Sequence, residues 1–194
     1  MLNMLLFVLI AVGGGLSATW MMVERGSALT TEVQGPWTHW TAAGRLDADP
    51  YTRAHFVRHA LLPVSTSLVA RYHASTDSDG QPLHSSCEYV LDGPEPARGW
   101  WSIAVYDASG KLIRNDAGRH SFTSDTAMRT PSGRIAVHLA RSARPGNWLP
   151  TGGAGRLTLV LQVEDPHDAT TGGGSAESDS ESLVQLPAVR RGGC

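Results

Sequence analysis

The sequence predicts a mainly β protein, an antiparallel β-sandwich with one short helix, preceded by a single N-terminal transmembrane helix. Three observations support this fold class: apolar and polar residues alternate in five segments, turn-forming residues separate those segments, and an uncharged apolar stretch opens the chain. Alternation with a period of two is typical of strands that bury one face. The 194 residues suffice for one such core but hardly two. A jelly roll is one sandwich topology that fits this pattern.

The opening stretch, residues 2–23, contains no charged side chain. As a helix, a stretch of this length spans the roughly 30 Å of a bilayer core. Trp20 suits the membrane interface, and Glu24 and Arg25 close the stretch. A cleaved secretory signal is the alternative, but no Lys or Arg precedes the apolar core and no clear small-residue cleavage site follows it. We therefore expect residues 1–25 to be a retained anchor.

The rest of the chain begins with residues 26–48, which show no lasting period and are expected to be an extended lead-in. Asp49 and Pro50 predict a helix start, as N-cap and first helical residue, and Pro63 ends the helical spacing. We expect a sandwich domain over residues 49–166, with roughly seven or eight strands. The alternating segments predict strands near residues 68–73, 87–91, 101–106, 134–139 and 156–163.

The C-terminal part is rich in Gly, Ser, Asp and Glu over residues 167–182, which predicts a flexible linker. Residues 183–194 then become apolar again and end in Cys194, so we expect this tail to dock on the domain. Cys87 and Cys194 are the two cysteines, an even number that favours a disulfide in an exported protein. We predict this disulfide, with Cα atoms about 4.4–6.8 Å apart. Two unrelated free thiols are the alternative.

Composition and motifs exclude several functions. A net charge of −2 with scattered basic residues argues against nucleic-acid binding. The sequence lacks a nucleophile elbow, a zinc-protease helix and a phosphate-binding loop. His55 and His59 are four residues apart on the predicted helix, but a metal site needs further ligands. We therefore predict neither a metal nor a cofactor.

A polar and aromatic set near the loops remains as the candidate surface for a ligand or partner. This set comprises Trp101, Tyr106, Asn115, Arg119, His120, Asn147 and Trp148. The guanidinium of Arg119 suits a carboxylate or phosphate, or equally the carbonyls of its own loop.

Residues 147–150, Asn-Trp-Leu-Pro, are interpreted first as a structural corner. We expect Trp148 to pack under the sheet and Asn147 to bond backbone groups of the Arg119 loop. On this view Trp148→Ala costs about 3–5 kcal/mol, and Asn147→Ala about 1–3 kcal/mol. Pro150 cannot pair as part of a central strand, and the glycines after it permit the turn into the last strand.

Two stretches resemble the domain-of-unknown-function 1214 (DUF1214) family. They are RGWWSIAVYDASGKLIRNDAGRHSFTS, residues 98–124, and RPGNWLPTGGAGRLTLVLQVEDP, residues 144–166. The shared features are a Trp-Ser-x-x-x-Tyr-Asp strand from Trp101, an Asn at 115, an Arg-aromatic segment from Arg119, and Asn-Trp-Leu-Pro. The resemblance covers about residues 37–166. His120 stands where the family commonly has Tyr, so a pocket lined by that residue would differ here.

The resemblance implies a β-sandwich and a companion protein of the domain-of-unknown-function 1254 (DUF1254) family, but no activity. We expect a non-enzymatic module at the inner membrane, anchored through residues 2–23, with its domain on the periplasmic side. The alternatives are a hydrolase using the Arg119 and Asn147 loops, and a lipid- or carbohydrate-binding sandwich.

Overall fold

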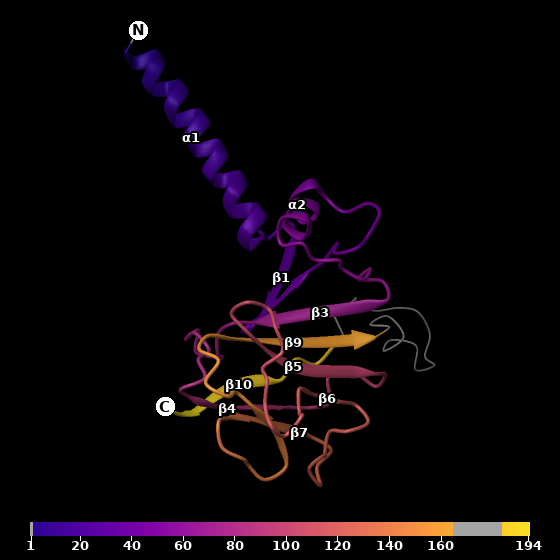
Figure 1. Cartoon of the computed structure of the whole chain (residues 1–194). Coiled ribbons are helices and arrows are strands. Elements are labelled where there is room, and N and C mark those ends of the chain that lie inside the picture. The colour runs from indigo at the N-terminus through magenta and orange to yellow at the C-terminus, as the bar shows by residue number, and fades with distance from the viewer. Residues whose placement is uncertain (1, 165–183) are drawn as a thin grey trace. The chain divides into compact units, whose positions relative to one another are not determined.

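The computed structural model describes residues 2–164 and 184–194, and this part of the chain forms two helices and ten strands (Figure 1). In chain order they are α1 Leu2–Arg25, β1 Thr31–Gln34, β2 Trp37–Trp40, α2 Pro50–Arg58, β3 Val69–Ala74, β4 Glu88–Gly93, β5 Trp101–Asp107, β6 Ser121–Thr123, β7 Ile135–Ala140, β8 Asn147–Pro150, β9 Leu157–Glu164 and β10 Ala188–Gly193. The chain divides into two compact units: Met1–Glu32 with Trp40–Thr66, and Val33–His39 with Ser67–Cys194.

Helix α1 forms because a long uncharged stretch satisfies its own backbone hydrogen bonds. It ends where the Gly26 amide donates to the Met22 carbonyl at 3.0 Å. Gly26 has φ +75°, the left-handed conformation that favours glycine at a helix end. By length and composition α1 could cross a membrane, although a signal sequence passes the same test.

Helix α2 begins as its sequence predicts. The Asp49 carboxylate accepts hydrogen bonds from the amides of Tyr51 and Thr52, at 2.9 and 3.0 Å, and Pro50 is the first helical residue. At its other end Ala60 adopts φ +51°, and the Leu61 amide donates to the Phe56 carbonyl at 2.9 Å. The chain therefore leaves the helix before Pro63, through a left-handed residue that is not glycine.

The strands form two sheets, which confirms the predicted mainly β, sandwich-like fold. The six-stranded sheet has the order β1-β2-β3-β9-β5-β6, and the four-stranded sheet has the order β10-β4-β7-β8. The larger sheet brings β3, β9 and β5 side by side, as Figure 1 shows. Antiparallel pairing joins β2 to β3, β3 and β5 to β9, β5 to β6, and β4 to both β7 and β10, whereas β8 runs parallel to β7. The smaller sheet is therefore mixed, with one parallel pair at its β8 edge.

The core forms where the alternating residues of both sheets face each other. All five predicted strands are present, as β3, β4, β5, β7 and β9. Their inward side chains are almost fully buried, while the residues between them are mostly polar or small, with valines 69, 90 and 160 as the exceptions. The largest include Tyr89, Leu91, Trp101, Ile103, Ile135, Leu139, Leu159 and Leu161.

Three predicted segments lie outside residues 49–166: the lead-in, the linker and the C-terminal tail. The predicted lead-in contains β1 and β2, and Trp37 of β2 is 1% exposed, with its indole nitrogen donating to the Pro187 carbonyl at 2.8 Å. In the tail, β10 pairs with β4 in the smaller sheet. The predicted linker, residues 167–182, lies outside the described residues.

Candidate functional site

The loop between β5 and β6 is organised by Asn115. Its Oδ1 accepts from the Arg119 amide at 2.9 Å, and its Nδ2 donates to the carbonyls of Arg119 and Ile113 at 2.9 and 3.1 Å. These bonds close residues 113–119 into a compact turn, with Gly118 at φ +60°. The polar atoms of Asn115 are thus occupied by backbone groups of its own loop.

Three other candidate residues lie on the same hairpin. His120 is half-buried, and its Nδ1 lies 3.1 Å from the Ile113 carbonyl, where the Nδ1–H tautomer donates. Tyr106, also half-buried, forms an isolated bridge with Leu112 at the base of the hairpin. Arg119 is exposed, and its guanidinium carbon lies 5.7 Å from the centre of the Phe122 ring. Among the described residues, the ion pairs do not include Arg119.

Asn147 lies in the other sheet and is 2% exposed. Its Oδ1 accepts from the Met128 amide at 2.7 Å, and its Nδ2 donates to the carbonyls of Met128 and Ala136 at 2.7 and 3.0 Å. The expectation that Asn147 bonds the Arg119 loop is therefore wrong. The reason is the parallel pairing of β8 with β7, which sets Asn147 beside Val137 and next to the chain that enters β7.

Trp148 is half-buried and does not pack under the sheet, which corrects the second expectation for this corner. Asn147 and Leu149 on either side of it are buried, so the alternation of the strand directs Trp148 to the outer face. There it lies opposite His138 of β7, and its indole nitrogen donates to the Ala140 carbonyl at 3.0 Å. Pro150 is accommodated because β8 is an edge strand.

The corner and the Arg119 loop meet through a glycine instead. Gly152, Gly153 and Gly155 all have positive φ, as expected of the turn into β9. A Cβ on Gly152 would come within 3.3 Å of Ile113 Cγ2 and 3.4 Å of the Arg114 carbonyl oxygen. The structure therefore groups Tyr106, Asn115, Arg119 and His120 on one hairpin and places Asn147 and Trp148 in the opposite sheet.

The predicted disulfide is present and joins Cys87 to Cys194, 107 residues apart. Their Cα atoms are 3.9 Å apart, slightly closer than the expected range. The bond connects the end of the C-terminal strand to the residue just before β4, the strand with which β10 pairs.

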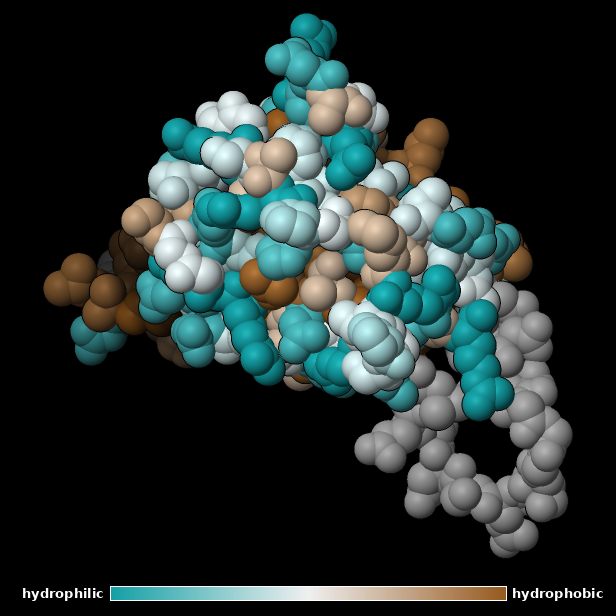
Figure 2. Space-filling model, turned by 90° about the horizontal axis from the view of Figure 1, so that it is seen from below, coloured by the Kyte–Doolittle hydropathy of each residue, from teal (hydrophilic) through white to brown (hydrophobic). Residues whose placement is uncertain are grey.

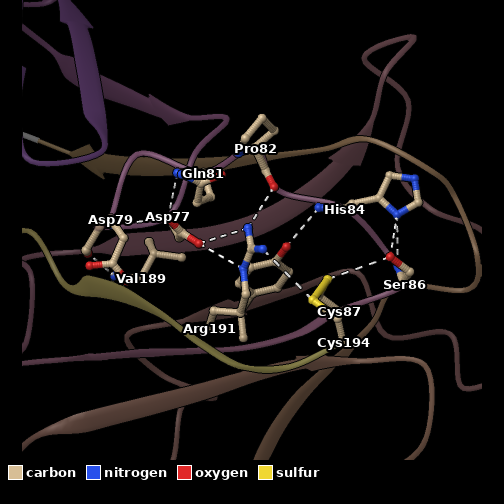
Figure 3. A network of polar contacts seen from close by, with 12 residues as sticks. Asp77, Asp79, Gln81, Pro82, His84, Ser86, Cys87, Val189, Arg191 and Cys194 are labelled. Atoms are coloured by element: carbon tan, nitrogen blue, oxygen red, sulfur yellow. Dashed lines mark hydrogen bonds and ion pairs between the residues drawn. A yellow bond between two sulfur atoms is a disulfide. The ribbon is translucent and has the colours of Figure 1, made fainter.

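A polar network beside this disulfide was not predicted as a site (Figure 3). Asp77 is 1% exposed, and its Oδ2 accepts from Nε of Arg191 at 3.0 Å. Its Oδ1 accepts from the amides of Asp79 and Gln81, at 3.1 and 2.8 Å, and Arg191 also donates to the Pro82 carbonyl at 3.1 Å. The turn signal at Asp77 and the adjacent arginines 190 and 191 were visible in the sequence, but nothing in it paired them.

The two histidines of α2 have different environments. His55 stacks on Trp40 with ring centres 4.2 Å apart, and its Nδ1 lies 2.8 Å from the Val23 carbonyl. His59 is exposed, with its Nε2 3.5 Å from a Glu24 carboxylate oxygen. Burial lowers the pKa of His55 from its ordinary value. Within the described ranges, no group of three His, Cys, Asp or Glu residues could hold a metal ion.

Comparison with known proteins adds one family and one fold. The profile of a family described as "Protein of unknown function (DUF1214)" matches residues 69–168, a narrower range than the resemblance suggested. No curated protein matches the chain.

Two solved structures are similar to the chain. The VPA0106 protein from Vibrio parahaemolyticus has 17% sequence identity and a TM-score of 0.62, over 94% of this chain and 43% of that one. The chain thus spans less than half the length of that protein, and the likeness concerns the fold. An uncharacterised protein from Burkholderia cenocepacia has 16% identity and a TM-score of 0.43, over 63% of this chain and 29% of that one.

Proposed function

The chain belongs to the DUF1214 family of proteins of unknown function, and from this premise we propose that it is a membrane-anchored, non-enzymatic binding module of the cell envelope. The proposal rests on the hydrogen bonds of two asparagines, Asn115 and Asn147, that belong to the motifs shared with the family. Asn115 and Asn147 direct their amide groups at backbone atoms, so they hold loops in place. The exposed Arg119 is then presented on a loop of defined shape, as suits recognition of a partner.

The proposed location rests on two further observations. The Cys87–Cys194 disulfide supports a domain outside the cytoplasm, where disulfides persist. Helix α2 contacts the last turns of α1: His55 lies 2.8 Å from the Val23 carbonyl, and the Arg58 guanidinium lies 4.0 Å from the Trp20 ring centre. Signal cleavage beyond residue 23 would remove these partners of α2, so the contacts support retention of at least the C-terminal end of α1.

The proposed partner is a protein of the DUF1254 family. We place its binding site on the surface of this chain that contains Arg119. The side chain is exposed, and its charge is unpaired among the described residues, so an acidic group of the partner could pair with it. The face shown in Figure 2 mixes hydrophilic and neutral side chains with scattered hydrophobic ones.

The test is co-purification, in mild detergent, of the full chain with a co-expressed DUF1254-family protein from the same organism. We expect the pair to co-purify and Arg119→Glu to weaken the complex at least several-fold. Arg98→Glu, at an exposed arginine of another loop, makes the same charge change and should leave the complex intact. If the wild-type proteins fail to co-purify, the partner proposal is lost. If both variants behave alike, the surface is not at Arg119.

The position of Trp148 favours a second candidate function, carbohydrate binding on the outer face of the smaller sheet. The register places Trp148, His138, Val90 and Arg190 in one row across its four strands. An aromatic ring beside polar groups suits the apolar face of a sugar. Pull-down with insoluble cell-wall polysaccharide should retain the wild type and Trp100→Ala, an exposed control, but lose Trp148→Ala. Equal retention of all three, or of none, would rule this candidate out.

A further inference from the structure

Helix α2 and the turn after it carry large apolar side chains that the protein leaves uncovered. Leu62 is 95% exposed, Val57 is 80% exposed, and Leu61 is 45% exposed. They lie within six residues, around the Ala60 turn that ends the helix. Exposed apolar side chains grouped in this way commonly mark a surface that meets another molecule or a membrane.

The contacts between α2 and α1 determine which surroundings these side chains meet. Arg58 stacks over Trp20, His55 contacts the Val23 carbonyl, and Arg58 and His59 both pair with Glu24. Residues 20–24 are the end of the apolar helix, and at 1.5 Å per residue they cover about 6 Å along its axis. The headgroup layer on each side of a bilayer core is about 5–8 Å thick. If α1 spans the bilayer, α2 is therefore held at the level of the headgroups.

We propose that α2 and its following turn form an interfacial element that inserts Val57, Leu61 and Leu62 into the bilayer that α1 crosses. This inference rests on the proposed anchor and adds a second, peripheral contact with the same membrane. The occupant is lipid, because these exposed apolar side chains belong to the same compact unit as α1, whose residues 2–21 are exposed. An element of this kind fixes how the chain leaves the membrane.

The charges of this unit indicate which lipids it accepts. Residues 2–32 and 40–66 contain four basic residues (25, 45, 53 and 58) and four acidic ones (24, 32, 47 and 49). Arg58 pairs with Glu24 and Arg45 with Asp47, so little positive charge is left to attract anionic headgroups. The contact is therefore apolar, and we expect it to form on neutral lipid and to depend little on salt.

The experiment uses the full chain in phosphatidylcholine nanodiscs, with one nitroxide at a time. The native cysteines are joined in the disulfide, so a label reacts with an introduced cysteine. Leu62→Cys is the test position, Met128→Cys an exposed control on the sandwich unit, and Val8→Cys a control on α1. The measurement is the ratio of collisions with lipid-soluble oxygen to collisions with a water-soluble nickel chelate.

We expect a ratio at position 62 several-fold above that at 128 and below that at 8. A ratio equal to that at 128 overturns the interfacial element while leaving the anchor intact. Low collision rates with both reagents at position 62 also overturn it, because they indicate a protein partner such as a second copy. A high nickel collision rate at position 8 refutes the proposed anchor, and with it this inference.

Discussion

At the scale of single residues, the family's characteristic side chains divide into those that support the backbone and those that face outward. Asn115 satisfies backbone groups of its own loop, and Asn147 satisfies those of Met128 in a loop and of Ala136 in β7. The buried indole of Trp101 donates to a Glu95 carboxylate oxygen at 3.1 Å. Hydrogen bonds from Arg129 hold the pKa of Glu95 below its ordinary value, so this acceptor is charged at neutral pH. Buried polar groups with such partners stabilise one backbone arrangement.

Replacing Asn147 by Ala should destabilise the domain by about 1–3 kcal/mol, because the Met128 amide and carbonyl and the Ala136 carbonyl lose their partner. The measurement is urea denaturation in detergent, followed by tryptophan fluorescence. Asn115→Ala is the control and should cost less, because Asn115 is only half-buried and water can replace its side chain. Native stability of Asn147→Ala with loss of partner binding would show that the role is functional.

Replacing Trp148 by Ala should lower the free energy of unfolding by about 1–2 kcal/mol. This is less than expected for a buried tryptophan, because the half-buried ring makes fewer apolar contacts. Trp101→Ala is the matched comparison and should cost about 3–5 kcal/mol, since Trp101 is fully buried. The same denaturation experiment measures both. Equal losses would mean that Trp148 belongs to the core.

At the scale of elements, two segments depend on partners distant in sequence. Strand β10 pairs with β4 and is also held by the Cys87–Cys194 bond and the Arg191–Asp77 ion pair. Helix α2 depends on α1, through the contacts of His55 and Arg58. In both cases a short element with little intrinsic stability is held by a few specific side chains.

Cys194→Ser should lower the free energy of unfolding by about 2–5 kcal/mol, because the lost cross-link closes a long loop in the unfolded chain. The urea midpoint of the variant and of the wild type, each with and without dithiothreitol, measures this. Reductant should bring the wild type to the level of the variant and leave the variant unchanged. A wild-type urea midpoint that is unchanged by complete reduction would contradict this prediction.

The packing of α2 should weaken as the pH falls below about 6.5, the ordinary pKa of histidine. Burial lowers the pKa of His55 in the folded protein, so the neutral ring is the form that packs on Trp40. Its contribution is present above the unfolded pKa of about 6.5 and is lost as the pH falls through the lower folded pKa. Hydrogen-exchange protection factors of the α2 amides, corrected for intrinsic rates, should fall over this range.

His55→Phe supplies the control for this pH dependence. It keeps an aromatic ring against Trp40 but cannot gain a proton, so α2 protection in the variant should be nearly constant over the same range. A wild type whose α2 protection is flat between pH 7 and about 5 would contradict the argument.

At the scale of the whole molecule, one core supports the sandwich while the anchor unit has its own contacts. The core draws on both sheets and includes Val184 and Val189 from the C-terminal segment. The core of the sandwich therefore includes residues beyond 69–168, the range matched by the family profile. The Cys87–Cys194 disulfide also fixes this C-terminal segment to the sandwich.

The proposed topology predicts that the C-terminal side of the chain lies in the periplasm. Alkaline phosphatase fused after residue 194 should be active in cells, and a fused fluorescent protein that matures only in the cytoplasm should be dark. In the unfused protein, Cys87 and Cys194 should resist alkylation until a reductant is added, because they are joined. The opposite pattern for the two reporters would place the domain in the cytoplasm.

Local patterns in the sequence were sufficient for the main elements. The period-two alternation located β3, β4, β5, β7 and β9, and the Asp49 cap located the start of α2. The uncharged opening stretch predicted α1, and the apolar, cysteine-ended tail predicted the disulfide. These signals are local because each reflects backbone geometry or burial of one face.

Only the tertiary structure decided which distant segments meet. The strands β1, β2, β6 and β8 have only three or four residues, too few to show a period, and β10 has the unpatterned sequence AVRRGG; these strands form because a neighbouring strand offers an edge. The parallel register of β8 on β7 directed Asn147 inward, to Met128, and Trp148 outward, beside His138. The pairing of Asp77 with Arg191 likewise joins residues 114 positions apart. A one-residue change of register reverses the face of every side chain, and register is set by long-range pairing that local sequence does not encode.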